Sequence, residues 1–150
     1  VAIVEAIAAD GPPVTPVFVV NTEPWLGQLA SLQRGLDAAA ALDVDGVLVT
    51  PVDIPMARPA TVRELIRVWG QTRAPIVRPA VGDRHGHPVL FDRAVFDALR
   101  CAPLALGARA VVHAWGDRLV NVAVDDEGCL IDIDTPADYD RIVGKGREPS

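Results

Sequence analysis

Apolar and polar positions follow two different spacings along this chain, and the spacing changes from segment to segment. The short apolar runs Val17–Val20 and Gly46–Val52 are bounded by polar and turn-forming residues, which predicts buried strands. Leucines recur at helical spacing through Gly27–Leu42, and alanines fill many of the other positions, which predicts a helix. This stretch is therefore predicted to form a strand, a helix and a second strand.

The same alternation continues to the end of the chain. Thr135 and Asp138, on either side of Pro136, mark the start of a last helix. Further helices are predicted over Val1–Ala9, Pro59–Trp69, Asp92–Leu99, Gly107–Trp115 and from Pro136 to residue 143, and further strands over Pro75–Arg78, Pro88–Phe91, Leu119–Val124 and Leu130–Ile133. Strands that alternate with helices favour an α/β fold, a three-layer sandwich with a mostly parallel sheet between its helices.

Composition narrows the class of protein. With 150 residues, half of them hydrophobic, the chain is long enough for one globular domain. Its formal net charge of -6 argues against a general nucleic-acid binder, and no apolar run reaches the roughly 20 residues of a membrane span. Cys101 and Cys129 are too few for a disulfide framework. We therefore expect a reduced, cytoplasmic setting, with no nucleic acid or membrane as partner.

The strand over Gly46–Val52 is followed by the acidic residue Asp53, and Pro55 prevents the strand from continuing. In parallel α/β sheets, ligands bind at the carboxyl ends of the strands. A carboxylate at such an end can hold a divalent cation against phosphate oxygens. The simpler interpretation is that Asp53 starts a turn or caps the next helix, and the residues around it leave both interpretations open.

Four motifs follow one another in this chain: Gly27-x-x-x-Ser31-x-x-x-Gly35, Asp53-Ile54-Pro55, Gly86-His87-Pro88-Val89-Leu90-Phe91 and Asp132-Ile133-Asp134-Thr135-Pro136. Together and in this order they are fairly specific. With them the chain resembles the nucleotidyltransferases of the molybdenum-cofactor cytidylyltransferase and guanylyltransferase group. The resemblance implies their Rossmann-like, glycosyltransferase-A-like fold over residues 1–143, followed by a polar tail over residues 144–150.

This resemblance implies an enzyme that transfers a nucleotidyl group from an NTP to a phosphorylated acceptor, such as a molybdopterin-type cofactor, and releases pyrophosphate. The implied substrate contacts are Gly27, Ser31 and Gly35 on the nucleotide side and Gly86, His87 and Pro88 on the acceptor side. Because His87 lies on a turn between glycine and proline, it either hydrogen-bonds the acceptor or holds the shape of the turn.

The resemblance also implies a Mg²⁺ site. Asp53 is the implied catalytic metal ligand, and the second ligand is Asp134 or Asp132, which lie two residues apart in the last motif. Magnesium prefers one or two carboxylates together with phosphates and waters, which agrees with such a pair. Helix capping is the alternative role for Asp134, although Thr135 can take it.

The sequence also departs from the family. No glycine-rich loop that would cradle the triphosphate follows a strand in this chain, and the chain begins inside what corresponds to the family's second helix. The first βαβ unit is therefore expected to be missing, and Gln33 stands where an Arg is common. We expect the 150-residue chain alone to be inactive. We also expect the strand over Gly46–Val52 to expose an edge that promotes self-association.

Two other classes of function stay open. Asp43-Val44-Asp45-Gly46-Val47 matches the start of haloacid-dehalogenase-like phosphatases, in which the first Asp is a nucleophile at a strand end. In this chain the preceding alanines favour a helix instead of a strand. The other class is a non-catalytic ligand-binding relative, which the missing glycine-rich loop would explain.

Overall fold

The computed structural model describes residues 17–143, so the predicted helix over Val1–Ala9 and the polar tail lie outside the described residues. The helices are α1 (Gln28–Ala40), α2 (Pro59–Thr72), α3 (Phe96–Cys101), α4 (Gly107–Ala114) and α5 (Pro136–Val143). The strands are β1 (Gly46–Val49), β2 (Ile76–Val81), β3 (Arg84–His85), β4 (Val89–Asp92) and β5 (Leu119–Ala123). Among the short 3₁₀ turns, η1 (Pro24–Leu26) and η5 (Glu127–Leu130) flank the loops discussed below.

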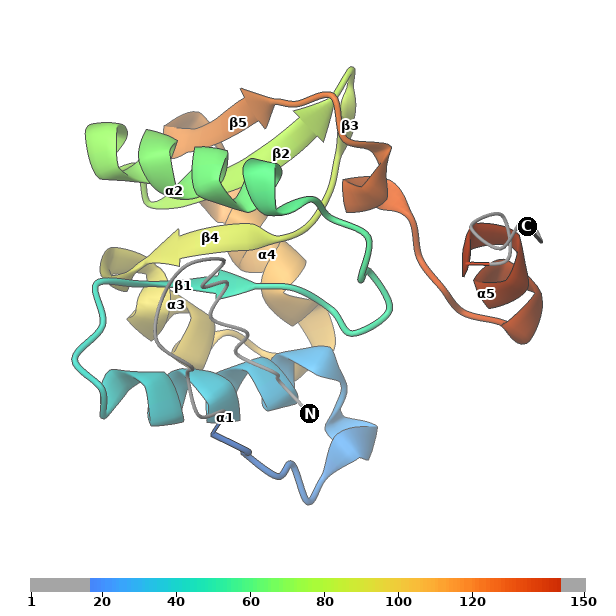
Figure 1. Ribbon diagram of the computed structural model, residues 1–150. Coiled ribbons are helices and arrows are strands. Elements are labelled where there is room, and N and C mark those ends of the chain that lie inside the picture. Colours follow the sequence, from blue (N-terminus) through green and yellow to red (C-terminus); the bar gives the residue numbers. More distant parts are fainter. Residues whose placement is uncertain (1–16, 144–150) are drawn as a thin grey trace.

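The sheet is mixed, whereas the sequence predicted a mostly parallel one (Figure 1). β4 pairs antiparallel with β1 and with β2, β3 pairs antiparallel with β2, and β5 lies parallel to β2. Because β4 lies between β1 and β2 and opposes both, β1, β2 and β5 still run in one direction. Their carboxyl ends meet at one edge of the sheet, where α/β folds bind ligands.

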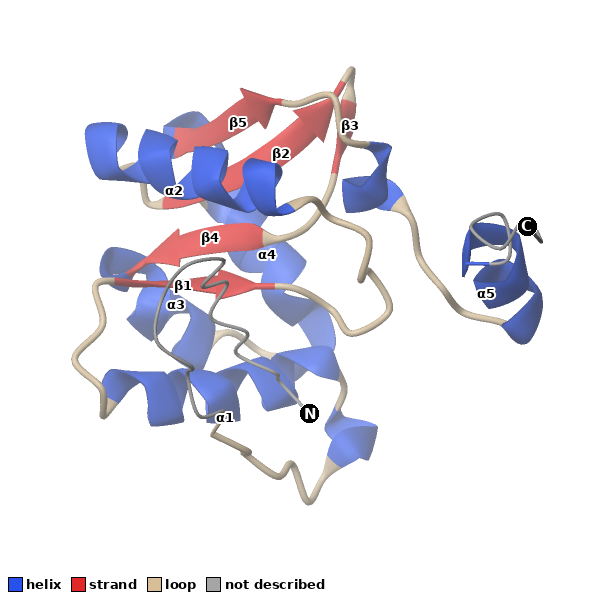
Figure 2. Ribbon diagram, in the orientation of Figure 1, coloured by secondary structure: helices blue, strands red, loops and turns tan. Residues whose placement is uncertain are grey.

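Helices cover both faces of the sheet, as predicted for a three-layer α/β fold (Figure 2). On one face, α1, α3 and α4 build a cluster that includes Leu36, Ile76, Phe91, Phe96 and Val111. On the other face, α2 builds a cluster that includes Leu65, Val77, Leu90 and Val122. Successive side chains of one strand point to opposite faces of a sheet. Ile76 and Val77 of β2 therefore belong to different clusters.

Three of the predicted strands are absent from the structure or end earlier than predicted. The run Val17–Val20 pairs with no described strand, and three of its four side chains are exposed. β1 ends at Val49 instead of residue 52, because Pro51 has no N–H for the ladder and its carbonyl accepts a turn hydrogen bond from the Ile54 N–H. Leu130–Ile133 is not a strand either: the chain forms η5 and then continues without regular structure.

The predicted helices are all present where the structure describes them, and the two predicted caps, at Asp92 and Thr135, are present as well. The carboxylate of Asp92 accepts a hydrogen bond from the Ala94 N–H at the start of the helical stretch that leads into α3. At α5, the Thr135 hydroxyl accepts from the Asp138 N–H, and the Asp138 carboxylate accepts from the Thr135 N–H. This reciprocal pair is a capping box, so Thr135 caps α5 and Asp134 does not.

Gln33 has a structural role that the sequence did not reveal. Its side-chain amide lies at the end of α3 and donates to the backbone carbonyls of Leu99, Arg100 and Ala102, at 3.0, 3.1 and 3.3 Å. The last carbonyls of a helix have no partner within the helix. Gln33 on α1 therefore satisfies the carboxyl end of α3.

Residues 126–133, which we call the clamp segment, hold together two loops at the carboxyl edge of the sheet. The Ile133 N–H donates to the carbonyl of Asp53 at 2.8 Å, and the His87 N–H donates to the carbonyl of Cys129 at 2.9 Å. The loop after β1 and the loop before β4 are therefore both fixed to the same segment.

Two glycines, Gly86 and Gly128, allow the clamp segment and the two loops to approach each other closely. A Cβ atom on Gly86 would overlap with the backbone carbonyl of Cys129, and a Cβ atom on Gly128 would overlap with the backbone carbonyl of Met56. Both contacts are backbone against backbone, so a flexible side chain cannot move aside to make room. Glycine is therefore required at both positions for steric reasons.

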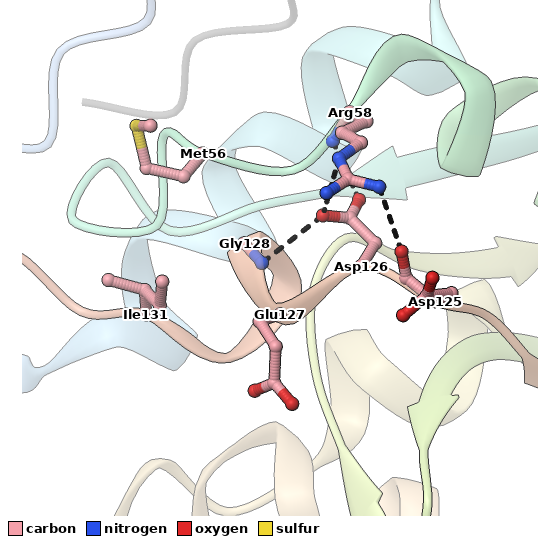
Figure 3. Close-up of a pocket in the computed structure, with 7 residues that line it drawn as sticks. All are labelled: Met56, Arg58, Asp125, Asp126, Glu127, Gly128 and Ile131. Carbon is pink, nitrogen blue, oxygen red and sulfur yellow. Dashed lines mark hydrogen bonds and ion pairs between the residues drawn. The ribbon is translucent and has the colours of Figure 1, made fainter. Parts of the chain in front are cut away.

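A buried carboxylate anchors the clamp segment to α2. Asp126 is 2% exposed, and its oxygens accept hydrogen bonds from the Arg58 N–H at 2.8 Å and from the Thr61 hydroxyl at 2.6 Å. It also accepts from the Gly128 N–H at 3.1 Å (Figure 3). Since Arg58 and Thr61 belong to the start of α2, Asp126 caps this helix from a distant part of the sequence.

These bonds also decide the charge state of Asp126. Burial alone would raise the pKa of Asp126, but the hydrogen bonds from Thr61, Arg58, Cys129 and Gly128 outweigh burial and lower the pKa below its ordinary value. Next to it, burial and the bond to Asp126 raise the pKa of the Cys129 thiol to about 12. Asp126 is therefore the charged partner, and Cys129 stays a neutral thiol.

Replacing Gly128 by alanine should destabilise the fold, because the new methyl group would overlap with the carbonyl of Met56. Overpacking of this kind typically costs about 1–3 kcal/mol. Gly70→Ala is the matched control, since it lies in α2 with open space around its added Cβ, and it should stabilise by about 0.5–1 kcal/mol. Urea unfolding measures both. Unchanged stability of Gly128→Ala would show that the clamp segment does not press on Met56.

Asp126→Asn should lower the free energy of unfolding by about 2 kcal/mol at neutral pH, since hydrogen bonds to charged groups contribute about 1.5–3 kcal/mol. The lowered folded-state pKa makes this contribution fully present above the ordinary carboxyl pKa of about 4. It is lost as the pH falls through the folded-state pKa. Unfolding curves from pH 7 to pH 2 should therefore show the two proteins converging only in acid.

The control for this experiment is Asp83→Asn, in the exposed turn between β2 and β3, which should change stability by less than about 0.5 kcal/mol. A difference between Asp126→Asn and the unsubstituted chain that stays constant down to pH 2 would mean that the charge of Asp126 does not stabilise the fold.

Candidate functional site

Asp53 lies in the loop between β1 and α2, at the carboxyl edge of the sheet. Its backbone is fixed, because its carbonyl accepts the Ile133 N–H at 2.8 Å. Its side chain is not satisfied: Oδ1 is buried and has no hydrogen-bond partner. Leaving a buried carboxylate oxygen without a partner costs free energy, so such a group calls for an explanation, and an ion is one of the usual ones.

His87 reaches the same edge from the other side. Val49 and Val89 are paired across β1 and β4, so the loop that follows β1 and the loop that precedes β4 leave the sheet next to each other. The ring of His87 is half-buried, and its Nδ1 atom is buried without a hydrogen-bond partner. Burial lowers the pKa of His87, and the backbone of Val49 and the charges of Asp132 and Asp53 only partly oppose this. The ring is therefore neutral at neutral pH.

The acidic residues of the last motif lie in different surroundings. Asp132 belongs to the clamp segment, and its charge acts on His87 together with that of Asp53. Asp134 lies beyond the clamp segment, just before α5, and no hydrogen bond or ion pair among residues 17–143 joins it to Asp53 or His87. Figure 1 shows α5 apart from the sheet and its helices. The structure thus brings together Asp53, His87 and Asp132, and leaves Asp134 outside this group.

The predicted nucleotide contacts lie at and near the start of α1. Gly27 is the N-cap of this helix, and Ser31 and Gly35 follow along it. The Ser31 hydroxyl accepts a hydrogen bond from the Asn21 amide at 2.9 Å. Figure 1 shows the start of α1 at the same end of the sheet as the loop that carries Asp53. The assignment of these three residues to the nucleotide stays a prediction.

Gly86 and Pro88, the other predicted acceptor contacts, are both buried, and Pro88 is among the fully buried side chains. Gly86 is packed against Cys129, as described above. In this structure both residues shape the loop around His87 and offer little surface to a ligand. A direct acceptor contact through either of them stays a prediction, and their visible role is to position the His87 backbone.

The structure also contains a pocket that the sequence did not predict. A pocket of about 280 Å³ is lined by Met56, Arg58, Asp125, Asp126, Glu127, Gly128 and Ile131 (Figure 3). Arg58 crosses it, with Nη1 donating to the carbonyl of Asp125 at 2.8 Å. From the sequence, the pair Asp125-Asp126 is interpreted as a turn, in preference to the acidic pair of a haloacid-dehalogenase-like phosphatase. No predicted site residue lines this pocket, although it adjoins the segments that carry Asp53 and Asp132.

The phosphatase alternative does not fit the structure. A nucleophilic Asp of that class stands at the carboxyl end of a strand, whereas Asp43 and Asp45 precede β1 and lie at its amino end. Asp43 is exposed and forms an ion pair with Arg93 at 2.7 Å. The preceding alanines are helical, as expected, and belong to α1.

The group at the sheet edge fits a divalent cation that is also held by substrate oxygens. In residues 17–143, no cluster of three or more His, Cys, Asp or Glu side chains is arranged to hold a metal by itself. Magnesium does not need such a cluster, since it usually takes one or two carboxylates together with waters and substrate phosphates. The unpartnered Oδ1 of Asp53 is the atom that such an ion would satisfy.

None of the helices in residues 17–143 combines the length and the apolar character that a membrane crossing requires.

The chain is similar to a known protein family and to several solved structures. Residues 4–121 match the family of MobA-like NTP transferase domains. The crystal structure of Rv0371c from Mycobacterium tuberculosis is similar over 92% of this chain and 67% of its own, with 34% identity and a TM-score of 0.68. A complex of Rv0371c with manganese is similar over 73% of this chain and 59% of its own, with 32% identity and a TM-score of 0.56. No curated protein matches the sequence significantly.

Molybdopterin-guanine dinucleotide biosynthesis protein A from Archaeoglobus fulgidus is 19% identical, with a TM-score of 0.59 over 79% of this chain and 64% of its own, and supports the fold. The chain thus spans about two thirds or less of the length of these structures. The family match covers well over half of the 150 residues. The chain therefore belongs to the family of MobA-like NTP transferase domains.

Proposed function

We propose that this domain takes part in the transfer of a nucleotidyl group from an NTP to a phosphorylated acceptor, such as a molybdopterin-type cofactor. An oxygen of the acceptor phosphate forms a bond to the α-phosphorus of the NTP, the bond from that phosphorus to the bridging oxygen breaks, and pyrophosphate leaves. Membership of the NTP transferase family supports the reaction type. The acceptor is inferred from the similarity of the motifs to those of molybdenum-cofactor enzymes.

The observation that carries the proposal is the buried, unpartnered Oδ1 atom of Asp53. Its backbone carbonyl accepts the Ile133 N–H, which fixes the loop that carries the carboxylate at this edge of the sheet. In our proposal, Asp53 is the main ligand of a Mg²⁺ ion. When bound, such an ion supplies positive charge against the phosphate oxygens of the nucleotide, where negative charge builds up during transfer.

The second carboxylate in our proposal is Asp132. It lies on the clamp segment, which is hydrogen-bonded to the Asp53 loop through Ile133. The negative charges of Asp132 and Asp53 both act to raise the pKa of His87. Asp134 is the alternative, and a movement of the segment around α5 would be needed to bring it to the ion. A ligand set of two carboxylates agrees with the preference of magnesium for few protein ligands.

The remaining site residues divide between two substrates in this proposal. The start of α1, with Gly27, Ser31 and Gly35, is assigned to the nucleotide, because a helix N-terminus attracts anionic groups. The loop over residues 86–88 is assigned to the acceptor side. A non-catalytic relative that binds the acceptor without turnover is the second candidate, since no glycine-rich triphosphate loop has been found in the sequence.

Asp53→Asn should abolish metal-dependent NTP consumption in a version of the chain extended at its N-terminus by a glycine-rich loop segment. The amide keeps the shape of the carboxylate but loses the charge that holds the ion, and we expect turnover to fall by at least about 100-fold, since the metal supplies several kcal/mol of stabilisation. Release of pyrophosphate from each NTP in turn, with Mg²⁺, is the measurement.

Asp83→Asn, in an exposed turn, is the matched control and should keep full turnover. Asp132→Asn should reduce turnover more than Asp134→Asn does. Near-native turnover of Asp53→Asn would contradict the nucleotidyltransferase assignment of this site. Acceptor binding without turnover in the unsubstituted extended protein would instead favour the non-catalytic candidate.

The 150-residue chain alone should self-associate and bind magnesium-NTP weakly. Among the described residues, β1 pairs only with β4, so its other edge carries unpaired backbone groups that can pair with a second chain. Light scattering over a dilution series tests the association, and calorimetric titration with magnesium-NTP tests the binding. The N-terminally extended version is the control and should be less associated. A monodisperse 150-residue monomer that binds NTP tightly would contradict both expectations.

A further inference from the structure

Two buried side-chain atoms in the described part of the chain lack a hydrogen-bond partner, namely Oδ1 of Asp53 and Nδ1 of His87. They come from the two loops that leave the paired ends of β1 and β4 side by side. The charge of Asp53 acts on the His87 ring, so the two groups lie near each other. An occupant between them would satisfy both atoms at once.

The Nδ1 atom of the His87 ring is available as a ligand atom. It is buried, and no group in the described part of the chain forms a hydrogen bond with it. Burial lowers the pKa of His87, so the ring is neutral at neutral pH. A neutral imidazole with its proton on Nε2 has a lone pair on Nδ1. Such a nitrogen can bind a metal ion.

We propose that His87 is a direct ligand of the metal ion, through Nδ1, together with Asp53. This inference rests on the proposed function, because the ion is the one assigned there to Asp53. It gives His87 a role that the motif resemblance did not: the resemblance placed this residue beside the acceptor. Gly86 and Pro88, both buried, then serve to hold the imidazole in position for the ion.

An imidazole ligand has a consequence for metal preference. Sites made of oxygen ligands suit Mg²⁺ and Ca²⁺, whereas an imidazole nitrogen raises the affinity for first-row transition ions relative to them. A site formed by Asp53, His87, waters and phosphate oxygens should therefore bind Mn²⁺ more tightly than Mg²⁺. Removal of the imidazole should remove most of this preference and leave Mg²⁺ affinity much less affected.

The test uses Mn²⁺ alone as the probe on the 150-residue chain, without nucleotide. Pulsed electron paramagnetic resonance of the bound Mn²⁺ should show coupling to one histidine nitrogen, and uniform ¹⁵N labelling of histidine should replace the ¹⁴N signal by a ¹⁵N signal. This measurement needs no substitution, so it does not depend on whether a variant folds. His87→Ala should abolish the coupling and weaken Mn²⁺ binding by at least about tenfold.

His85→Ala and His113→Ala are matched controls, because both side chains are exposed and lie on β3 and α4. Both should keep the coupling. Mn²⁺ that binds in an Asp53-dependent way but shows no histidine nitrogen coupling would overturn the assignment of His87 and leave the proposed function intact. Histidine-coupled Mn²⁺ in a protein whose extended version consumes no NTP would support the metal site and overturn the proposed function.

Discussion

The arrangement of the candidate site depends on the hydrogen bonds that fix the clamp segment, residues 126–133. Asp126 anchors this segment to the start of α2, where its buried carboxylate accepts from the Arg58 N–H and the Thr61 hydroxyl. The segment then bonds to the Asp53 loop through Ile133 and to the His87 loop through Cys129. One buried charge thus fixes, through backbone contacts, two loops that are more than 30 residues apart in sequence.

The sheet supplies the second part of this arrangement. β1, β2 and β5 send their carboxyl ends to one edge, as in other α/β folds that bind ligands there. β4 opposes its neighbours, so its amino end, preceded by His87, reaches the same edge. A parallel β4 would have placed the His87 loop at the opposite edge. The antiparallel strand therefore allows a carboxylate and an imidazole from different loops to lie at one edge of the sheet.

The sequence predicted the elements whose signals are local. The helix over Gly27–Leu42 and the caps at Asp92 and Thr135 could be predicted because leucine spacing and short polar side chains act within one or two turns. The direction of β4, the cap that Gln33 provides to α3 and the role of Asp126 could not, because each depends on a partner distant in sequence. For the same reason Leu130–Ile133 was wrongly predicted as a strand: its Ile133 N–H donates to the Asp53 loop, and no described strand pairs with it. Asp53 and His87 were found as motif residues, whereas their shared surroundings required the fold.

The clamp segment joins the Asp53 and His87 loops into one cooperative unit. Amide hydrogen exchange of the Asp126→Asn variant, followed by nuclear magnetic resonance, measures this coupling. The Ile133 and His87 amides donate to Asp53 and Cys129, far in sequence from Arg58 and Thr61, the partners of Asp126 in α2. If this coupling holds, both amides should lose protection by a similar factor, together with the Arg58 amide. Loss of protection at Arg58 and Gly128 alone, with Ile133 and His87 unchanged, would contradict it.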